Sequence, residues 1–118
     1  MEKNISINKF RNKFKKKNTT GAWIQLSDPN IAKIVSKISY IDWICLDLEH
    51  GLINVNLVPS IVDSVENSNK IILARISVHE INNIPKILDS GIDGFILANI
   101  RSIDQIKKVY KLCNYPPL

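Results

Sequence analysis

The chain reads Ile-Asp-Trp-Ile-Cys-Leu-Asp-Leu-Glu-His-Gly at residues 41–51. Apolar residues fill both alternating faces of this stretch until its end, which is typical of a parallel strand covered on both sides. Side chains alternate along a strand, so the face formed by Ile44, Leu46 and Leu48 is expected to meet covering helices. Asp47 and Glu49 lie on the opposite face, at the strand's carboxyl end. The stretch therefore predicts a buried strand that ends in two carboxylates.

Outside this stretch, short apolar strands alternate with segments whose apolar residues recur at helical spacing. Strands are predicted at residues 21–26, 41–49, 70–76 and 92–98. Helices are predicted at residues 4–17, 29–38, 55–66, 80–89 and 102–113. Asp28 and Pro29 suit the cap and the first position of the second helix. An N-terminal helix followed by four strand–helix units indicates an α/β fold with a parallel sheet.

Two architectures fit this alternation. The chain has 118 residues, which suits one domain or part of one. Length favours a complete open sheet of flavodoxin or receiver type, but a receiver needs an acidic pair after its first strand, where only Asp28 occurs. The residues at the strand ends favour the N-terminal half of a (β/α)8 TIM barrel, a fold of about 250 residues. We expect the barrel half, with strands in sequential order and the N-terminal helix closing one end.

The charge distribution excludes several classes of protein. The formal net charge is +5, but the basic excess is confined to residues 1–17, which favours a solvated helix end over a nucleic-acid surface. No apolar run reaches the roughly 18 residues of a membrane span, and the N-terminus lacks a signal-peptide pattern. Cys45 and Cys113 form no metal or disulfide pattern and are expected to be reduced core thiols. We therefore expect a cytoplasmic protein that binds neither nucleic acid nor membrane.

Charged residues at neighbouring strand ends form the candidate site. Arg75 ends the third predicted strand on the face that matches Asp47 and Glu49, so these groups are expected to converge with His50 beyond the carboxyl ends of the strands. His50 is a suitable general base near neutral pH, and Arg75 suits an anionic oxygen. A buried Arg–carboxylate pair with an incidental loop histidine is the structural alternative. His79 is expected to be a surface residue.

Several motifs, in order along the chain, resemble those of the HpcH/HpaI aldolase family. The most specific is Asp42-Trp43-x-x-x-Asp47-x-Glu49-His50-Gly51. The others are Gly21-x-Trp23-x-x-Leu26-Ser27-x-Pro29, Ala74-Arg75-Ile76, Leu88-Asp89-x-Gly91 and Tyr115-Pro116-Pro117. The resemblance implies a (β/α)8 barrel and a class II, pyruvate-dependent aldolase. Such an enzyme reversibly cleaves a 4-hydroxy-2-oxo acid to pyruvate and an aldehyde.

The resemblance also implies roles for four residues. His50 matches the proton acceptor, Arg75 the residue that stabilises the pyruvate enolate, and Asp47 an acid close to the base. Asp89 matches an acid that raises the basicity of the histidine. Because Asp89 ends a predicted helix, geometry within one chain puts it at the opposite end of the sheet from His50. A contact between subunits would bring the two together, and an ordinary helix-end polar residue is the alternative.

The family resemblance further implies a divalent metal, Mg²⁺, Mn²⁺ or Co²⁺, that polarises the 2-oxo acid. The metal-binding Glu and Asp of the family lie beyond the position of Leu118, so residues 1–118 are expected to form a single partial domain that binds metal weakly. We expect a small 2-oxo acid as the substrate, homo-oligomerisation of the full-length protein, and little activity of the fragment alone. The alternative is a non-catalytic remnant or interaction module of the same family.

Overall fold

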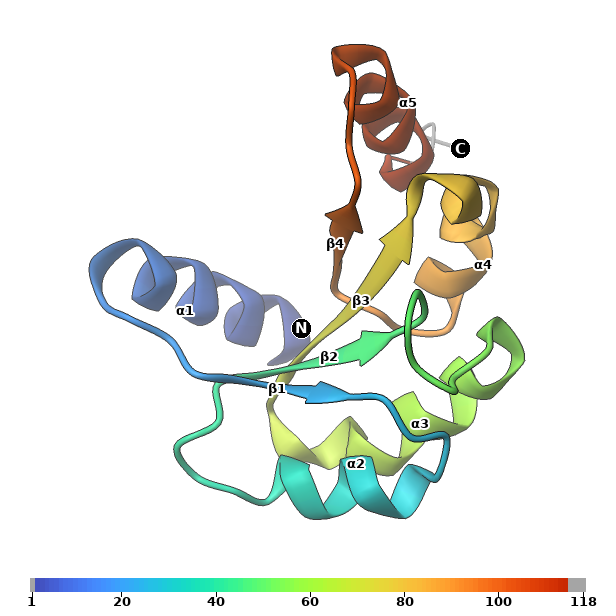
Figure 1. Ribbon diagram of the computed structural model, residues 1–118. Helices are drawn as coiled ribbons and strands as arrows, with labels where there is room; N and C mark the ends of the chain where they lie inside the picture. Colours follow the sequence, from blue (N-terminus) through green and yellow to red (C-terminus); the bar gives the residue numbers. More distant parts are fainter. Residues whose placement is uncertain (1, 115–118) are drawn as a thin grey trace.

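The computed structural model describes residues 2–114, which form a parallel sheet of four strands with helices between them (Figure 1). The strands are β1 (Gly21–Ile24), β2 (Trp43–Asp47), β3 (Ile71–Ser77) and β4 (Gly94–Ala98). The α-helices are α1 (Glu2–Lys16), α2 (Pro29–Ser36), α3 (Val58–Val65), α4 (Ile84–Asp89) and α5 (Ile103–Cys113). Short 3₁₀ segments are η1 (Val55–Leu57), η2 (Glu66–Ser68) and η3 (Val78–Asn83). The Tyr115-Pro116-Pro117 motif lies outside the described residues.

The strands lie in the order β1-β2-β3-β4, and every neighbouring pair is parallel. This order confirms the barrel-type expectation and excludes a flavodoxin-type sheet, in which the first strand would lie between the second and third. The register pairs Asp47 of β2 with Arg75 of β3. Parallel strands end at the same edge, so this register brings both side chains to the carboxyl edge of the sheet.

The core lies between the sheet and the helices that connect its strands. Apolar side chains of alternate strand positions pack against buried residues of α3 and α4 in one continuous cluster. On β2 and β3 these positions are Ile44, Leu46, Ile72, Ala74 and Ile76. Asp28 caps α2 by accepting a hydrogen bond from the Asn30 N–H, and Pro29 begins the helix, as predicted. None of the helices in residues 2–114 combines the length and apolar character needed to cross a bilayer.

The helix α1 lies on the opposite face of the sheet from α2 and α3, toward the end where the strands begin (Figure 1). An ion pair between Lys13 and Asp42 joins its last turn to the residue before β2, and it lowers the pKa of Asp42. The helical spacing of Ile7, Phe10 and Phe14 predicts a helix that docks on the rest of the fold, and this prediction was wrong for Phe14. That side chain is 64% exposed, and its ring stacks on Phe10 with ring centroids 5.8 Å apart.

Two other helices depart from expectation. The segment predicted as one helix over residues 80–89 begins as the 3₁₀ segment η3, and α4 begins only at Ile84, with Pro85 in its first turn. Proline suits the first turn because its missing N–H would have no partner in the helix there. The apolar residues that recur at helical spacing on α5 are Ile103, Ile106, Val109 and Tyr110, and of these Val109 alone is buried. The exposed members of the stripe are Ile103, Ile106 and Tyr110.

Candidate active site at the carboxyl edge of the sheet

The candidate site is built on the turn that follows β2. Leu48 continues the pairing with β3 by donating its N–H to the Arg75 carbonyl at 3.0 Å. The turn then folds back, and the Leu52 N–H donates to the Gln25 carbonyl at 2.7 Å. Gly51 passes so close to the Asp47 carbonyl and the Gln25 backbone that a Cβ would clash there. Glycine is therefore required for the tight turn that carries Glu49 and His50.

Asp47 organises this turn although its side chain is completely buried. Its Oδ1 accepts hydrogen bonds from the backbone N–H groups of Glu49 and His50, at 3.1 and 3.0 Å. Its Oδ2 accepts from Gln25 Nε2 at 3.1 Å, and Arg75 donates to both oxygens. Burial alone would raise the pKa of Asp47, but the hydrogen bonds from Arg75, His50, Gln25 and Glu49 hold the pKa well below its usual range.

Arg75 forms a bidentate ion pair with Asp47, in which Nε lies 3.1 Å from Oδ1 and Nη2 lies 2.6 Å from Oδ2. This pairing is the main cause of the raised pKa of Arg75. The Trp23 ring lies 4.8 Å from the guanidinium carbon and fixes the plane of the group by a cation–π contact. Nη1 donates no hydrogen bond within the described residues. Arg75 is therefore a rigid cation with donor capacity left for a bound anion.

Glu49 joins Arg75 to His50. Its Oε2 lies 3.6 Å from Arg75 Nε, and its Oε1 lies 3.3 Å from His50 Nε2. Oε1 also accepts a hydrogen bond from Asn99 Nδ2 at 3.0 Å, whereas the buried Oε2 accepts none within residues 2–114. The His50 side chain is 67% exposed, so its ring can reach a solute while Glu49 orients it. Asn99 was not identified from the sequence; its position directly after β4 was the available signal.

The structure thus brings His50, Asp47 and Arg75 together with Glu49 at one edge of the sheet. It does not bring Asp89 there. Asp89 is the last residue of α4, which leads into β4, so it lies at the opposite end of the strands. Within one chain, Asp89 cannot act on the imidazole, and a role for it requires a second copy.

The residues that the structure describes do not form a metal site. No group of three potential ligands from His, Cys, Asp and Glu occurs within the described part of the chain. Both oxygens of Asp47 are occupied by donors, which leaves Glu49 Oε2 as the open carboxylate oxygen. Cys45 is also unsuitable, because burial raises the pKa of its thiol to about 12. Mg²⁺ takes six oxygen ligands, several of them water and usually one or two of them protein carboxylates. The described residues offer it a single open carboxylate oxygen, and that oxygen lies 3.6 Å from the Arg75 cation.

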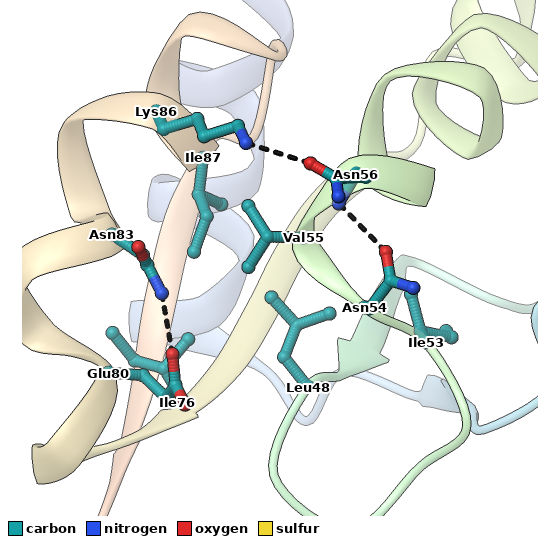
Figure 2. A pocket seen from close by; sticks show the side chains of 10 residues that line it. All are labelled: Leu48, Ile53, Asn54, Val55, Asn56, Ile76, Glu80, Asn83, Lys86 and Ile87. Atoms are coloured by element: carbon teal, nitrogen blue, oxygen red, sulfur yellow. Dashed lines mark hydrogen bonds between the residues drawn. The ribbon is translucent and has the colours of Figure 1, made fainter.

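A separate cavity of about 380 Å³ lies between the loop after β2 and the region of η3 and α4 (Figure 2). Its floor is apolar, with Leu48, Val55 and Ile87, and Lys86 Nζ donates to Asn56 Oδ1 across its rim at 2.8 Å. Leu48 belongs to the helix-facing side of the sheet, and none of the candidate catalytic side chains lines this cavity. The candidate catalytic residues and this cavity are therefore separate features of the fold.

Sequence comparisons with known proteins all indicate one protein family. The sequence model of the HpcH/HpaI aldolase/citrate lyase family matches residues 19–118. The chain is 24% identical to the hydroxypyruvate/pyruvate aldolase of Roseobacter denitrificans and 28% identical to the 5-keto-4-deoxy-D-glucarate aldolase of Klebsiella pneumoniae. Each alignment covers 82% of this chain but only 38% of the relative. The chain therefore spans well under half the length of these curated relatives.

Solved structures agree with the fold. An HpcH/HpaI aldolase from Desulfitobacterium hafniense superposes with a TM-score of 0.77 at 25% identity, covering 92% of this chain and 42% of that one. A family protein from Burkholderia cenocepacia superposes with a TM-score of 0.79 at 20% identity, covering 93% and 44%. The four strands and their helices therefore form part of a TIM barrel.

Proposed function

Because the chain belongs to the HpcH/HpaI aldolase/citrate lyase family, we propose that its carboxyl-edge cluster forms the base and anion-binding part of an aldolase site. The reaction is the reversible cleavage of a 4-hydroxy-2-oxo acid to pyruvate and an aldehyde. The observation that carries this proposal is the arrangement of Arg75 and His50 on either side of Glu49, at 3.6 and 3.3 Å. One group can hold an anion while the other moves a proton.

The proposed cleavage uses each group in turn. Arg75 holds the 2-oxo acid through its unoccupied N–H donors, while Asp47 and Trp23 keep the guanidinium in place. His50 accepts the proton of the 4-hydroxyl group, the C3–C4 bond breaks, and its electron pair moves onto the 2-oxo group to form the enolate of pyruvate. The hydrogen bonds from Arg75 stabilise the enolate oxygen. His50 then returns the proton to C3, which releases pyruvate.

The metal expected from the family resemblance would add charge stabilisation of the enolate when bound. The described residues do not form its site, so no step above depends on it. The lack of a metal site among the described residues supports the expectation that the chain alone turns over little substrate. It equally supports the alternative of a non-catalytic member of the family. We further propose a cytoplasmic homo-oligomer that acts on a small 2-oxo acid, in which Asp89 could reach His50 only across an interface between copies.

Turnover of the chain is tested by coupling pyruvate release from 4-hydroxy-2-oxo acids to lactate dehydrogenase, with added Mg²⁺, Mn²⁺ or Co²⁺. We expect pyruvate release close to the buffer background, because the described residues lack a metal site. Pyruvate itself should still bind, and a titration of the ¹⁵N-labelled chain should shift the amide signals of His50, Arg75 and Asn99. Absence of those shifts would contradict the proposed function.

The variant His50→Ala tests the aldolase assignment separately from the expected inactivity of the chain. Its side chain is exposed, so the change in the free energy of unfolding should be within about 0.5 kcal/mol. If the wild type does release pyruvate in a metal-dependent way, His50→Ala should lower that rate by about 10²–10⁴-fold. That result would support the aldolase assignment and show that the expected inactivity of the chain was wrong. Lys108→Ala is the control, since Lys108 is exposed on α5 and lies outside the cluster.

A further inference from the structure

The cavity of about 380 Å³ shown in Figure 2 has no part in the cleavage chemistry proposed above. Its walls come from two neighbouring connections of the fold: one leads from the end of β2 into η1, and the other leads from η3 into α4. The volume falls within the range of about 300–1,000 Å³ that is typical of small-molecule sites. Such sites combine an apolar lining with a few polar groups that orient the ligand, and this cavity has both.

The apolar lining of the cavity belongs to the buried core. Ile76 and Ile87 are completely buried, and Ile53 is 4% exposed. Leu48 and Val55 are partly buried and pack against the same core cluster. Apolar side chains beside an open volume lack contact partners on that side, and a hydrocarbon group placed there supplies them. The lining therefore suits the hydrocarbon part of a ligand.

Lys86 supplies a cation at the rim of the cavity. Its Nζ donates to Asn56 Oδ1 at 2.8 Å, which links the two walls. Asn56 is itself held in the cap of η1, because its backbone N–H donates to Asn54 Oδ1 at 2.9 Å. An ammonium group has three N–H donors, so Lys86 can hold Asn56 and a carboxylate oxygen at the same time. A hydrogen bond of that kind is strong, because both partners are charged.

Glu80 lies at the opposite end of the cavity from Lys86 (Figure 2). Its Oε2 accepts a hydrogen bond from Asn83 Nδ2, so a neutral donor of the cavity wall already serves this carboxylate. A ligand with a negative charge at both ends would be attracted by Lys86 and repelled by Glu80. The two charges therefore favour a ligand with one carboxylate and an uncharged far end.

We propose that this cavity binds a short aliphatic monocarboxylate. Its carboxylate is held by Lys86, and its hydrocarbon chain lies against Leu48, Val55 and Ile87. Neither His50 nor Arg75 lines the cavity, so this site does not rest on the proposed function. A ligand bound here leaves the candidate active site free for a 2-oxo acid.

Titration of the intact, methyl-labelled chain with hexanoate tests this site. We expect saturable shifts of the methyl signals of Leu48, Val55 and Ile87. Lys86→Gln should weaken hexanoate binding about tenfold or more, because it removes a hydrogen bond between two charged groups. Lys86 is exposed, so this variant should remain folded. Lys107→Gln is the matched control, since it removes an exposed charge from α5 outside the cavity and should leave the affinity unchanged.

Related probes test the chemical class of the ligand. Hexan-1-ol has the same chain without the charge, and we expect it to bind about tenfold or more weakly than hexanoate. Hexanedioate adds a second carboxylate, which Glu80 should repel, so it should also bind more weakly. Hexylamine binding as tight as that of hexanoate, or a hexanoate affinity that survives Lys86→Gln, would overturn the assignment to a carboxylate.

Two results would overturn the site itself. One is the absence of saturable shifts at the three methyl-bearing residues. The other is displacement of hexanoate by pyruvate at concentrations that saturate the amide signals of His50 and Arg75, since that would place hexanoate in the candidate active site. Failure of pyruvate to bind would contradict the proposed function alone, because hexanoate binding depends on neither His50 nor Arg75.

Discussion

Replacing Asp47 with alanine should destabilise the chain by about 3–5 kcal/mol, the cost of removing one partner from a buried ion pair. The loss is large because Asp47 is completely buried and accepts five hydrogen bonds. Without it, the backbone N–H groups of Glu49 and His50 lose their acceptor, and the Arg75 charge loses its counter-ion. Whole domains are stable by only about 5–15 kcal/mol, so a fraction of the variant should be unfolded in water. Urea unfolding monitored by tryptophan fluorescence measures the change.

The matched control is Asp63→Ala, which removes an exposed carboxylate from α3 and should change the stability by less than about 0.5 kcal/mol.

The pH dependence of stability gives a second test of the role of Asp47. The folded-state pKa of Asp47 is depressed, so its stabilisation is fully present above the unfolded pKa of about 4 and is lost as the pH falls toward the folded value. Asp47→Asn should therefore lose less stability on acidification than the wild type. If Asp47→Asn and the wild type lose equal stability on acidification, the charge of Asp47 is not the source of that loss.

The convergence of Asp47 and Arg75 could be predicted because two simple periodicities fix it. Side chains alternate along each strand, and parallel strands that are consecutive in the chain end at the same edge of the sheet. These rules required only that β2 and β3 be neighbours, and the register then paired the two residues directly. The sequence could therefore predict both the sheet and the charged pair.

The same rules could not identify Asn99 or the joining role of Glu49. The Asn99–Glu49 hydrogen bond spans 50 residues and depends on a left-handed backbone in the loop after β4. Periodicity describes strands and helices, but it does not describe how a loop turns. His79 is exposed, as the sequence predicted.

The apolar stripe of α5 shows a different limit of sequence analysis. Helical spacing indicates which residues share a face, but it does not indicate what covers that face. Val109 packs on the core, while Ile103 is 70% exposed. The pattern therefore predicted the helix correctly, but it could not indicate which of its apolar residues are buried.

Replacing Arg75 with lysine should weaken pyruvate binding by about 10- to 100-fold while the chain remains folded, because each charged hydrogen bond contributes about 1.5–3 kcal/mol. Lysine keeps the positive charge beside Asp47, so the buried carboxylate is not left without a counter-ion. It lacks the planar fork, however, and cannot hold both oxygens of Asp47 and still direct donors at a substrate. It also loses the flat contact with Trp23, whose ring now lies 4.8 Å from the guanidinium carbon. Titration calorimetry with pyruvate measures the affinity, and urea unfolding checks that the fold is retained.

The control for this substitution is Arg11→Lys, which makes the same chemical change at an exposed position of α1 and should leave pyruvate binding unaltered. An unchanged affinity in Arg75→Lys would show that a point charge is sufficient, and that the geometry of the guanidinium does not direct substrate binding. A complete loss of folding would instead show that Arg75 serves stability first. The expected result lies between these two, because Asp47 and Trp23 already fix the orientation of Arg75, while its remaining donors are left to bind an anion. The fixed donor fork is what distinguishes a substrate-binding arginine from a structural ion pair at this edge of the sheet.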